Sequence, residues 1–200
     1  MSADSLRLFI AIDVPDAWRA ALAGVQERLE RVAPGFLRRV DPKLMHLTLA
    51  FLGYQPAERL PSIEQAMRAA AGRCRPFALR IGRLGFFGSP GEVRVVWASV
   101  EAAPGVLEGL HGALVAALKA QGIDLDERPL VPHITLGRGQ RERDAAASRR
   151  VAEAVSTMAV GALAPHTVTS LVLYRSDLRP KGPSYTALRT VPLGEEGMRP

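Results

Sequence analysis

Two short stretches of the sequence share one pattern, His46-Leu47-Thr48-Leu49 and His133-Ile134-Thr135-Leu136. Each lies in a short apolar run flanked by prolines, which favours a buried β-strand over a helix. In a strand, side chains two positions apart point to the same face, and the rise is about 3.3 Å per residue. Each stretch therefore presents one imidazole beside one hydroxyl, while its leucine and isoleucine side chains face a core.

The same displacement relates other parts of the chain. His133 follows His46 by 87 residues, and this shift also carries the apolar stretch that starts at Leu6 onto the one that starts at Val93. Thr occupies 7 of the 200 positions and there are four histidines, two of which have a Thr two residues later. Chance would produce such a pair about one time in a hundred. An internal repeat of a strand-helix-strand-helix unit explains the pattern.

The repeat predicts an α+β fold of two pseudo-symmetric lobes, each an antiparallel-type sheet with outer helices, around a central cleft. We expect a single bilobal catalytic domain over residues 1–192, with lobe-like repeats at about 6–85 and 93–175, a last strand at about 185–191, and a flexible tail at 193–200. Apolar periodicity predicts helices after Pro15, at about 58–71, at 104–122 and from a polar start near 141–144 to about 158. Further strands are expected at 6–12, 77–81, 93–100 and 168–174, with a turn at 85–91 and a loop at 176–183.

The composition limits the class of protein. No apolar run reaches the roughly 18 residues of a membrane span, and the start of the chain lacks the pattern of a signal peptide. We therefore expect a cytoplasmic protein without a membrane partner. The single cysteine, Cys74, forms no internal disulfide and offers no metal-ligand spacing, which favours a structural role.

The basic residues permit a nucleic-acid partner. The formal net charge is +6, and 23 of the 26 basic residues are Arg, the side chain best shaped for bidentate contact with phosphate. Scattered Arg is also typical of a solvated surface, so the charge alone does not identify a partner.

The paired motif suits phosphodiester cleavage. An imidazole with an unperturbed pKa of about 6.5 gives or takes a proton at neutral pH, so a facing pair can hold one neutral and one protonated member. The neighbouring hydroxyls can donate hydrogen bonds to the non-bridging phosphate oxygens. No metal or cofactor is expected, because the sequence has no metal-ligand cluster, no P-loop and no Gly-x-Ser-x-Gly elbow.

The sequence resembles the 2H phosphoesterase superfamily, which is named for two His-x-Thr-x motifs. Within it, the chain is similar to the bacterial and archaeal RNA 2′,3′-cyclic phosphodiesterases once called 2′-5′ RNA ligases. The resemblance covers nearly the whole chain, and the stretches that carry it are Arg7–Ile12, His46–Gly53, Arg94–Ala98, Pro132–Arg138 and Leu171–Ser176, with Gly182 and Tyr185 near the end.

This resemblance implies hydrolysis of a 2′,3′-cyclic phosphate at an RNA end to a 2′-phosphate. By position, His46 matches the histidine that protonates the departing 3′ oxygen, and His133 matches the one that deprotonates water. Thr48, Thr135 and Arg138 match residues that bind the phosphate. The near symmetry of the two motifs does not itself assign the acid and the base.

The sequence allows more than one interpretation of the positions of two neighbouring residues. Strand alternation places Arg138 on the face opposite His133 unless the strand bends or ends there. Phe51, the counterpart of Arg138 in the first motif, suits either stacking on a base or packing in the core.

The same residues also fit other functions. The same site could join tRNA halves through a 2′-5′ bond or open another cyclic phosphate, such as that of ADP-ribose. Ligation through ATP activation is disfavoured, because none of the three lysines lies in a nucleotidyl-transfer motif. A non-catalytic RNA-binding module would explain the charge but not two titratable imidazoles. The expected partners are RNA with a 2′,3′-cyclic phosphate terminus or cyclic nucleotides, bound by a monomer.

Overall fold

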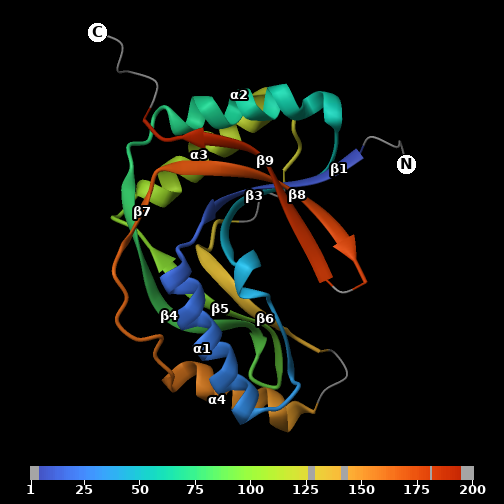
Figure 1. Ribbon diagram of the computed structural model, residues 1–200, viewed down its shortest axis with the longest axis vertical. Coiled ribbons are helices and arrows are strands. Elements are labelled where there is room, and N and C mark those ends of the chain that lie inside the picture. Colours follow the sequence, from blue (N-terminus) through green and yellow to red (C-terminus); the bar gives the residue numbers. More distant parts are fainter. Residues whose placement is uncertain (1–4, 126–128, 141–143, 181, 195–200) are drawn as a thin grey trace.

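The structure, a computed structural model, describes residues 5–125, 129–140, 144–180 and 182–194 (Figure 1). Over these residues the strands are β1 (Ser5–Asp13), β2 (Leu37–Arg39), β3 (His46–Pro56), β4 (Phe77–Ser89), β5 (Glu92–Glu101), β6 (His133–Gly139), β7 (His166–Val168), β8 (Ser170–Arg179) and β9 (Gly182–Pro192). The α-helices are α1 (Asp16–Val32), α2 (Leu60–Ala71), α3 (Val106–Ala120) and α4 (Ala145–Thr157). The predicted α+β fold and its four helices are confirmed; residues 141–143, where the last helix was expected to start, lie outside the described residues.

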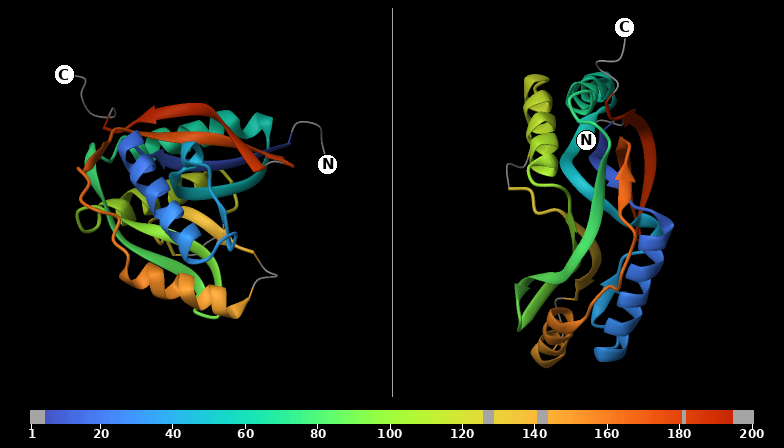
Figure 2. Two further views of the ribbon diagram at one scale, coloured as in Figure 1. Left: turned by 60° about the horizontal axis from the view of Figure 1, so that its bottom comes forward. Right: turned by 90° about the vertical axis from the view of Figure 1, so that its left-hand side faces the viewer.

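All strand pairs are antiparallel, and their order in the sheet is β7-β4-β5-β6-β3-β1-β8-β9, with β2 paired to β6. The first lobe comprises β1, β3, β8 and β9, which lie with α2 and α3 at one end of the molecule. The second lobe comprises β4, β5 and β6, which lie with α1 and α4 at the other end (Figures 1 and 2). The two lobes meet where β3 pairs with β6.

The two sequence repeats do not coincide with these two lobes. The unit β1-α1-β3-α2-β4 corresponds to β5-α3-β6-α4-β8. However, β4 pairs with β5 and β8 pairs with β1, so the last strand of each unit joins the first strand of the other. Each lobe is therefore built from both halves of the chain, which ties the halves together through the sheet.

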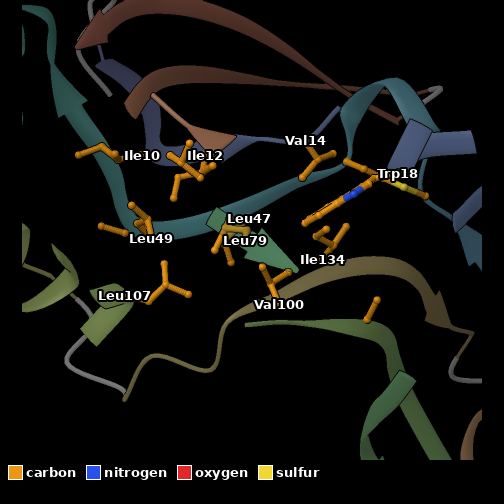
Figure 3. Packing of buried hydrophobic residues seen from close by; sticks show 14 of the residues in the cluster. Ile10, Ile12, Val14, Trp18, Leu47, Leu49, Leu79, Val100, Leu107 and Ile134 are labelled. Carbon is orange, nitrogen blue, oxygen red and sulfur yellow. The ribbon is translucent and has the colours of Figure 1, made fainter. Parts of the chain in front are cut away.

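The apolar residues of the two motif strands lie in one continuous core. Leu47 and Ile134 are fully buried, and Leu49 and Leu136 nearly so. They pack with residues from β1, β4, β5 and α1, among them the buried Trp18 of α1 (Figure 3). Burying one such side chain contributes about 1.5–3 kcal/mol, so the core fixes which face of each strand turns inward.

Each motif strand contains a β-bulge immediately after its His-x-Thr. On β3, Thr48 pairs with Ala11 and Ala50 with Ile10, so Leu49 is the extra residue. On β6, Thr135 pairs with Trp97 and Gly137 with Val96, so Leu136 is the extra residue. A bulge reverses the alternation of side chains beyond it. The two lobes therefore share this irregularity as well as their strands.

The strand register shows that the 87-residue shift between the histidines does not hold for their strand partners. His46 pairs with Asp13 and His133 pairs with Ser99, and these two partners are 86 residues apart instead of 87. The loops between the strands differ in length, so a single shift does not superpose the whole unit.

Two predicted turns are wrong. Strand β4 continues to Ser89, although its glycines favoured a turn from Gly85, and β8 and β9 form a hairpin where a loop at 176–183 was expected. Gly85 serves packing: a Cβ there would lie 2.2 Å from the Trp97 ring.

At the C-terminal end, Leu193 is buried and its N–H donates a hydrogen bond to the Thr169 carbonyl, so it does not belong to a flexible tail. Residues 195–200 lie outside the described residues.

Candidate active site

The pairing of β3 with β6 brings the two motifs together. Leu47 pairs with Ile134 in antiparallel register, so one step along the ladder sets His46 opposite Thr135 and Thr48 opposite His133. All four side chains lie on the face opposite the buried leucines, which we call the histidine face. The approximate two-fold axis passes through the Leu47–Ile134 pair. The predicted meeting of the two imidazoles with their hydroxyls is thus found on neighbouring strands of one curled sheet.

Both imidazoles are oriented by the same backbone contact. Nδ1 of His46 lies 2.7 Å from the carbonyl oxygen of Leu44, and Nδ1 of His133 lies 2.7 Å from that of Val131. A carbonyl only accepts, so each Nδ1 carries the hydrogen, and Nε2 is the atom left for proton transfer. The residue two positions before each histidine therefore fixes its tautomer and its direction.

His46 is enclosed by aromatic rings of the first lobe. Its ring stacks on Phe9 at 4.8 Å and meets the edge of Tyr185 at 5.4 Å. This burial lowers the pKa of the His46 imidazole. The hydrogen bond to the Leu44 carbonyl and the Asp13 carboxylate act in the opposite direction, while the nearby His133 lowers the pKa further. In the free protein the neutral imidazole is therefore favoured at His46.

His133 has a different setting in the second lobe. Its ring meets Phe87 edge-on at 5.2 Å and lies 6.3 Å from Trp97. Its cross-strand partner is Ser99 instead of a carboxylate, and the Ser99 hydroxyl is buried without a hydrogen-bond partner among the described residues. The two imidazoles thus share geometry but not charge environment.

The threonine hydroxyls are available to a ligand. Thr48 and Thr135 are both partly exposed, and neither hydroxyl has a hydrogen-bond partner within the part of the chain that the structure describes. Two hydroxyl donors therefore flank the space between the imidazoles.

The bulge at Leu136 decides the position of Arg138. Simple alternation would place Arg138 opposite His133, but the extra residue moves it to the histidine face, where it is exposed and paired with Val95. Burial raises the pKa of the Tyr185 hydroxyl, and the positive charge of Arg138 acts against this rise, so Arg138 lies near the first lobe. The structure thus resolves the conflict between strand parity and the expected position.

Phe51 occupies the equivalent place after the bulge on β3. Its side chain is 53% exposed and pairs with Phe9 on the histidine face, with ring centroids 6.2 Å apart. The alternative that Phe51 packs in the core is therefore wrong. An exposed aromatic ring near His46 can stack on a base.

Sequence reasoning missed three supporting contacts. The buried Gln26 amide donates to the carbonyls of Leu136 and Val40, both at 2.7 Å, and so satisfies the backbone at the β6 bulge. The Tyr174 hydroxyl donates to Asp13 at 2.7 Å. In the sequence, the only sign of the role of Gln26 is that a polar residue lies among the apolar residues of α1. The position of Asp13 opposite His46 follows only from the strand register.

Other parts of the described chain offer less chemistry. They contain no group of three or more His, Cys, Asp or Glu residues able to hold a metal ion, and no helix long and apolar enough to cross a membrane. A cavity lies between α2, α3 and the start of β4, away from the histidine face; it is mostly apolar and is lined by Cys74, Phe77 and Leu110 among others.

A sequence profile of the 2′-5′ RNA ligase superfamily matches residues 13–180. The chain belongs to this superfamily. The matched region includes both motifs and the bulge that follows each of them, so the resemblance seen in the sequence to the 2H phosphoesterases is confirmed.

Individual relatives align over most of the chain. The RNA 2′,3′-cyclic phosphodiesterase of Thermus thermophilus is 37% identical over 198 residues, which cover 96% of this chain and 93% of the relative. The crystal structure of TT0787 from the same organism has a TM-score of 0.73 at 32% identity and covers 96% of this chain and 100% of its own. The structure of E. coli LigT complexed with 3′-AMP has a TM-score of 0.69 at 28% identity and covers 96% and 99%.

Proposed function

We propose that this protein hydrolyses 2′,3′-cyclic phosphate ends of RNA to 2′-phosphates without a metal ion. The observation that carries the proposal is the pair of imidazoles on one sheet face, each with Nδ1 engaged by a backbone carbonyl and Nε2 left for chemistry. Two groups that exchange protons near neutral pH supply both the acid and the base that the reaction needs.

In the proposed step, Nε2 of His133 accepts a proton from water as the water oxygen attacks phosphorus. The bond between phosphorus and the 3′ oxygen breaks, and Nε2 of His46 donates a proton to that oxygen. The products are a free 3′ hydroxyl and a 2′-phosphate. The resemblance to the superfamily supports this order of roles.

The remaining residues stabilise charge on the phosphate. Thr48 and Thr135 donate hydrogen bonds to the non-bridging oxygens from opposite strands, and the Arg138 guanidinium neutralises the charge that develops as water attacks. Phe51 stacks on the base of the terminal nucleotide. The curated name of the Thermus relative, RNA 2′,3′-cyclic phosphodiesterase, and the binding of 3′-AMP by E. coli LigT support this substrate class.

Turnover of 2′,3′-cyclic AMP and of a cyclic-phosphate RNA oligonucleotide in excess EDTA tests the proposal. We expect 2′-phosphate as the product, and a loss of about 10²- to 10⁴-fold in kcat for His46→Ala and for His133→Ala. His111→Ala is the matched control, because His111 lies on α3 outside this site. Undiminished turnover by either motif variant would contradict the proposal.

The superfamily name favours ligation as a second function of the same site. A 5′ hydroxyl of another RNA would replace water as the nucleophile, and the 3′ oxygen would depart as before, which leaves a 2′-5′ bond. No lysine adenylate is needed for this route. Incubation of the protein with cyclic-phosphate and 5′-hydroxyl tRNA halves would measure ligation against hydrolysis, and ADP-ribose cyclic phosphate would test the other alternative substrate.

We further propose that residues 1–192 act as one bilobal catalytic domain, as a monomer in the cytoplasm. The exchange of strands between the lobes supports a single folding unit. Light scattering after size exclusion measures the mass, and a dimer would contradict this part of the proposal.

A further inference from the structure

Two arginines lie directly opposite each other at the end of the histidine face. Strand β2 pairs with β6, and in that register Arg38 is the Cα partner of Arg138. Both side chains are exposed, and neither guanidinium has an ion-pair or hydrogen-bond partner among the described residues. Like charges at directly opposed strand positions are destabilising, so this pairing favours an anion between or above the two groups.

The backbone leaves little room for a side chain on either side of Arg138. Arg138 is flanked by Gly137 and Gly139, and a Cβ at Gly139 would lie 1.9 Å from the carbonyl oxygen of Val93. A Cβ at Gly137 would lie 3.3 Å from the Arg38 carbonyl oxygen. Close approach of β2, β6 and β5 thus keeps side chains off the two positions that flank Arg138.

The arginine pair continues the proposed active site. Arg38 shares the face of its partner Arg138, which the bulge has turned to the side of His133 and Thr135. Two ladder positions separate Thr135 from Arg138, or about 7 Å along the strand, and the paired Cβ atoms lie about 5 Å apart. A step of this size resembles the spacing of neighbouring phosphates in an extended single strand.

We propose that Arg38, together with Arg138, binds the internucleotide phosphate on the 5′ side of the terminal nucleotide. The inference rests on the proposed function, and it gives the site a preference for RNA ends over cyclic mononucleotides. Arg suits this role, because its planar fork contacts phosphate through two hydrogen bonds and stays charged at every relevant pH. The cyclic phosphate itself lies between the imidazoles, and Arg138 spans both phosphates.

A comparison of two substrates tests the inference. One is a trinucleotide that ends in a 2′,3′-cyclic phosphate, and the other is 2′,3′-cyclic AMP, which has no internucleotide phosphate. For Arg38→Ala we expect KM for the trinucleotide to rise about tenfold, while KM for the mononucleotide changes less than about twofold. The slope of log kcat/KM against log salt for the trinucleotide should fall by about 0.7, the value for one lost contact with a single strand.

The neighbouring residue supplies a matched control. Arg39 is also exposed on β2, but it pairs with Gly137 and points to the opposite face, so Arg39→Ala should leave both substrates and the salt slope unchanged. An equal loss on both substrates for Arg38→Ala, or an equal loss for Arg39→Ala, would overturn the inference. If the wild-type protein opened neither substrate, the proposed function itself would fail, and the two failures are thus distinguishable.

Discussion

His46 and His133 occupy equivalent backbone positions in lobes whose side chains differ. Each follows a carbonyl that fixes its Nδ1, precedes a threonine on the same face, and lies three residues before a bulge. Around this shared frame, His46 has a carboxylate and a stacked phenylalanine, whereas His133 has a serine and an edge-on phenylalanine. The repeated backbone geometry places the two imidazoles that exchange protons. The side chains around them are not repeated, so the two imidazoles have different surroundings.

The residues after the bulges show the same division. The structure places Phe51 and Arg138 at corresponding points on the histidine face, one aromatic and one cationic. An RNA end carries a base and a phosphate. An aromatic side chain alone would not bind the phosphate, and a cationic side chain alone would not stack on the base. The asymmetry of the side chains therefore suits a substrate that is itself asymmetric.

The threonine pair tests the symmetric part of this comparison and, outside the two histidines themselves, should give the largest effect. Thr48→Val and Thr135→Val keep the shape of the side chain and remove only the hydroxyl donor. We expect each to lower kcat on a cyclic phosphate by about 10²-fold, the usual loss of one donor to a transition-state oxygen. Steady-state turnover of 2′,3′-cyclic AMP gives the measurement.

Thr157→Val on α4 is the control, because its hydroxyl only donates to backbone carbonyls within that helix. A loss at Thr135 without any loss at Thr48 would show that one lobe alone binds the phosphate.

Gln26 tests whether the two bulges are equally supported. Its amide satisfies the Leu136 carbonyl from within the core, while no side chain of the described residues donates to the Leu49 carbonyl. Gln26→Leu removes the side-chain donor to the Val40 carbonyl and leaves the Leu136 carbonyl with only the Val40 N–H, so we expect it to lower the free energy of unfolding by about 1–3 kcal/mol. Urea unfolding measures this change, and turnover should fall because Arg138 follows the bulge.

Gln55→Leu is the counterpart on the first lobe, since Gln55 also donates its amide to a carbonyl, that of Leu52, but near the surface. A cost as large as that of Gln26→Leu would mean that burial of the bulge carbonyl is irrelevant.

Much of this arrangement follows from the sequence. The spacing of two His-x-Thr patterns predicted two equivalent strands, and the apolar periodicity after Pro15 predicted a helix. Both predictions hold because burial of one face fixes a strand's orientation and a helix's rotation.

The parts that could not be predicted depend on pairing between distant segments. Strand exchange between the repeats, the partner of each histidine, and the arginine pair are all matters of register, which no local pattern contains. The bulges have no residue signature either, so alternation misplaced Arg138. Gly85 looked like a turn residue because its true role, making room for Trp97, arises only in the folded sheet.

Removal of Phe51 should weaken substrate binding more than it slows the chemical step. Phe51→Ala removes an exposed ring that stacks on a base, a contact worth about 1–3 kcal/mol. We expect KM for cyclic-phosphate RNA to rise by about tenfold with little change in kcat. Tyr54→Ala is the control, because Tyr54 is also an exposed aromatic residue of β3 but lies further from His46, opposite Arg7. A fall in kcat without a rise in KM would place Phe51 in orienting His46 instead of binding the base.

Asp13 and Ser99 offer the finest test, because they are the equivalent cross-strand partners of the two histidines. The Asp13 carboxylate favours the imidazolium and so opposes the burial that lowers the pKa of His46. Asp13→Asn removes this charge but keeps an oxygen that accepts from Tyr174. The pKa of His46 should therefore fall further, which an NMR titration of the ring proton measures directly.

The pH profile of the same variant then assigns the acid and the base. If His46 is the proton donor, kcat/KM requires its protonated form, and the alkaline limb of the profile moves to lower pH in Asp13→Asn, so activity at neutral pH falls. If His46 is instead the base, the acidic limb moves to lower pH and activity at neutral pH does not fall. Ser99→Ala removes no charge and should move neither limb. Because burial favours neutral His46 in the free protein, its role as donor also requires the bound phosphate to raise its pKa, and the alkaline limb of kcat should therefore lie at higher pH than that of kcat/KM.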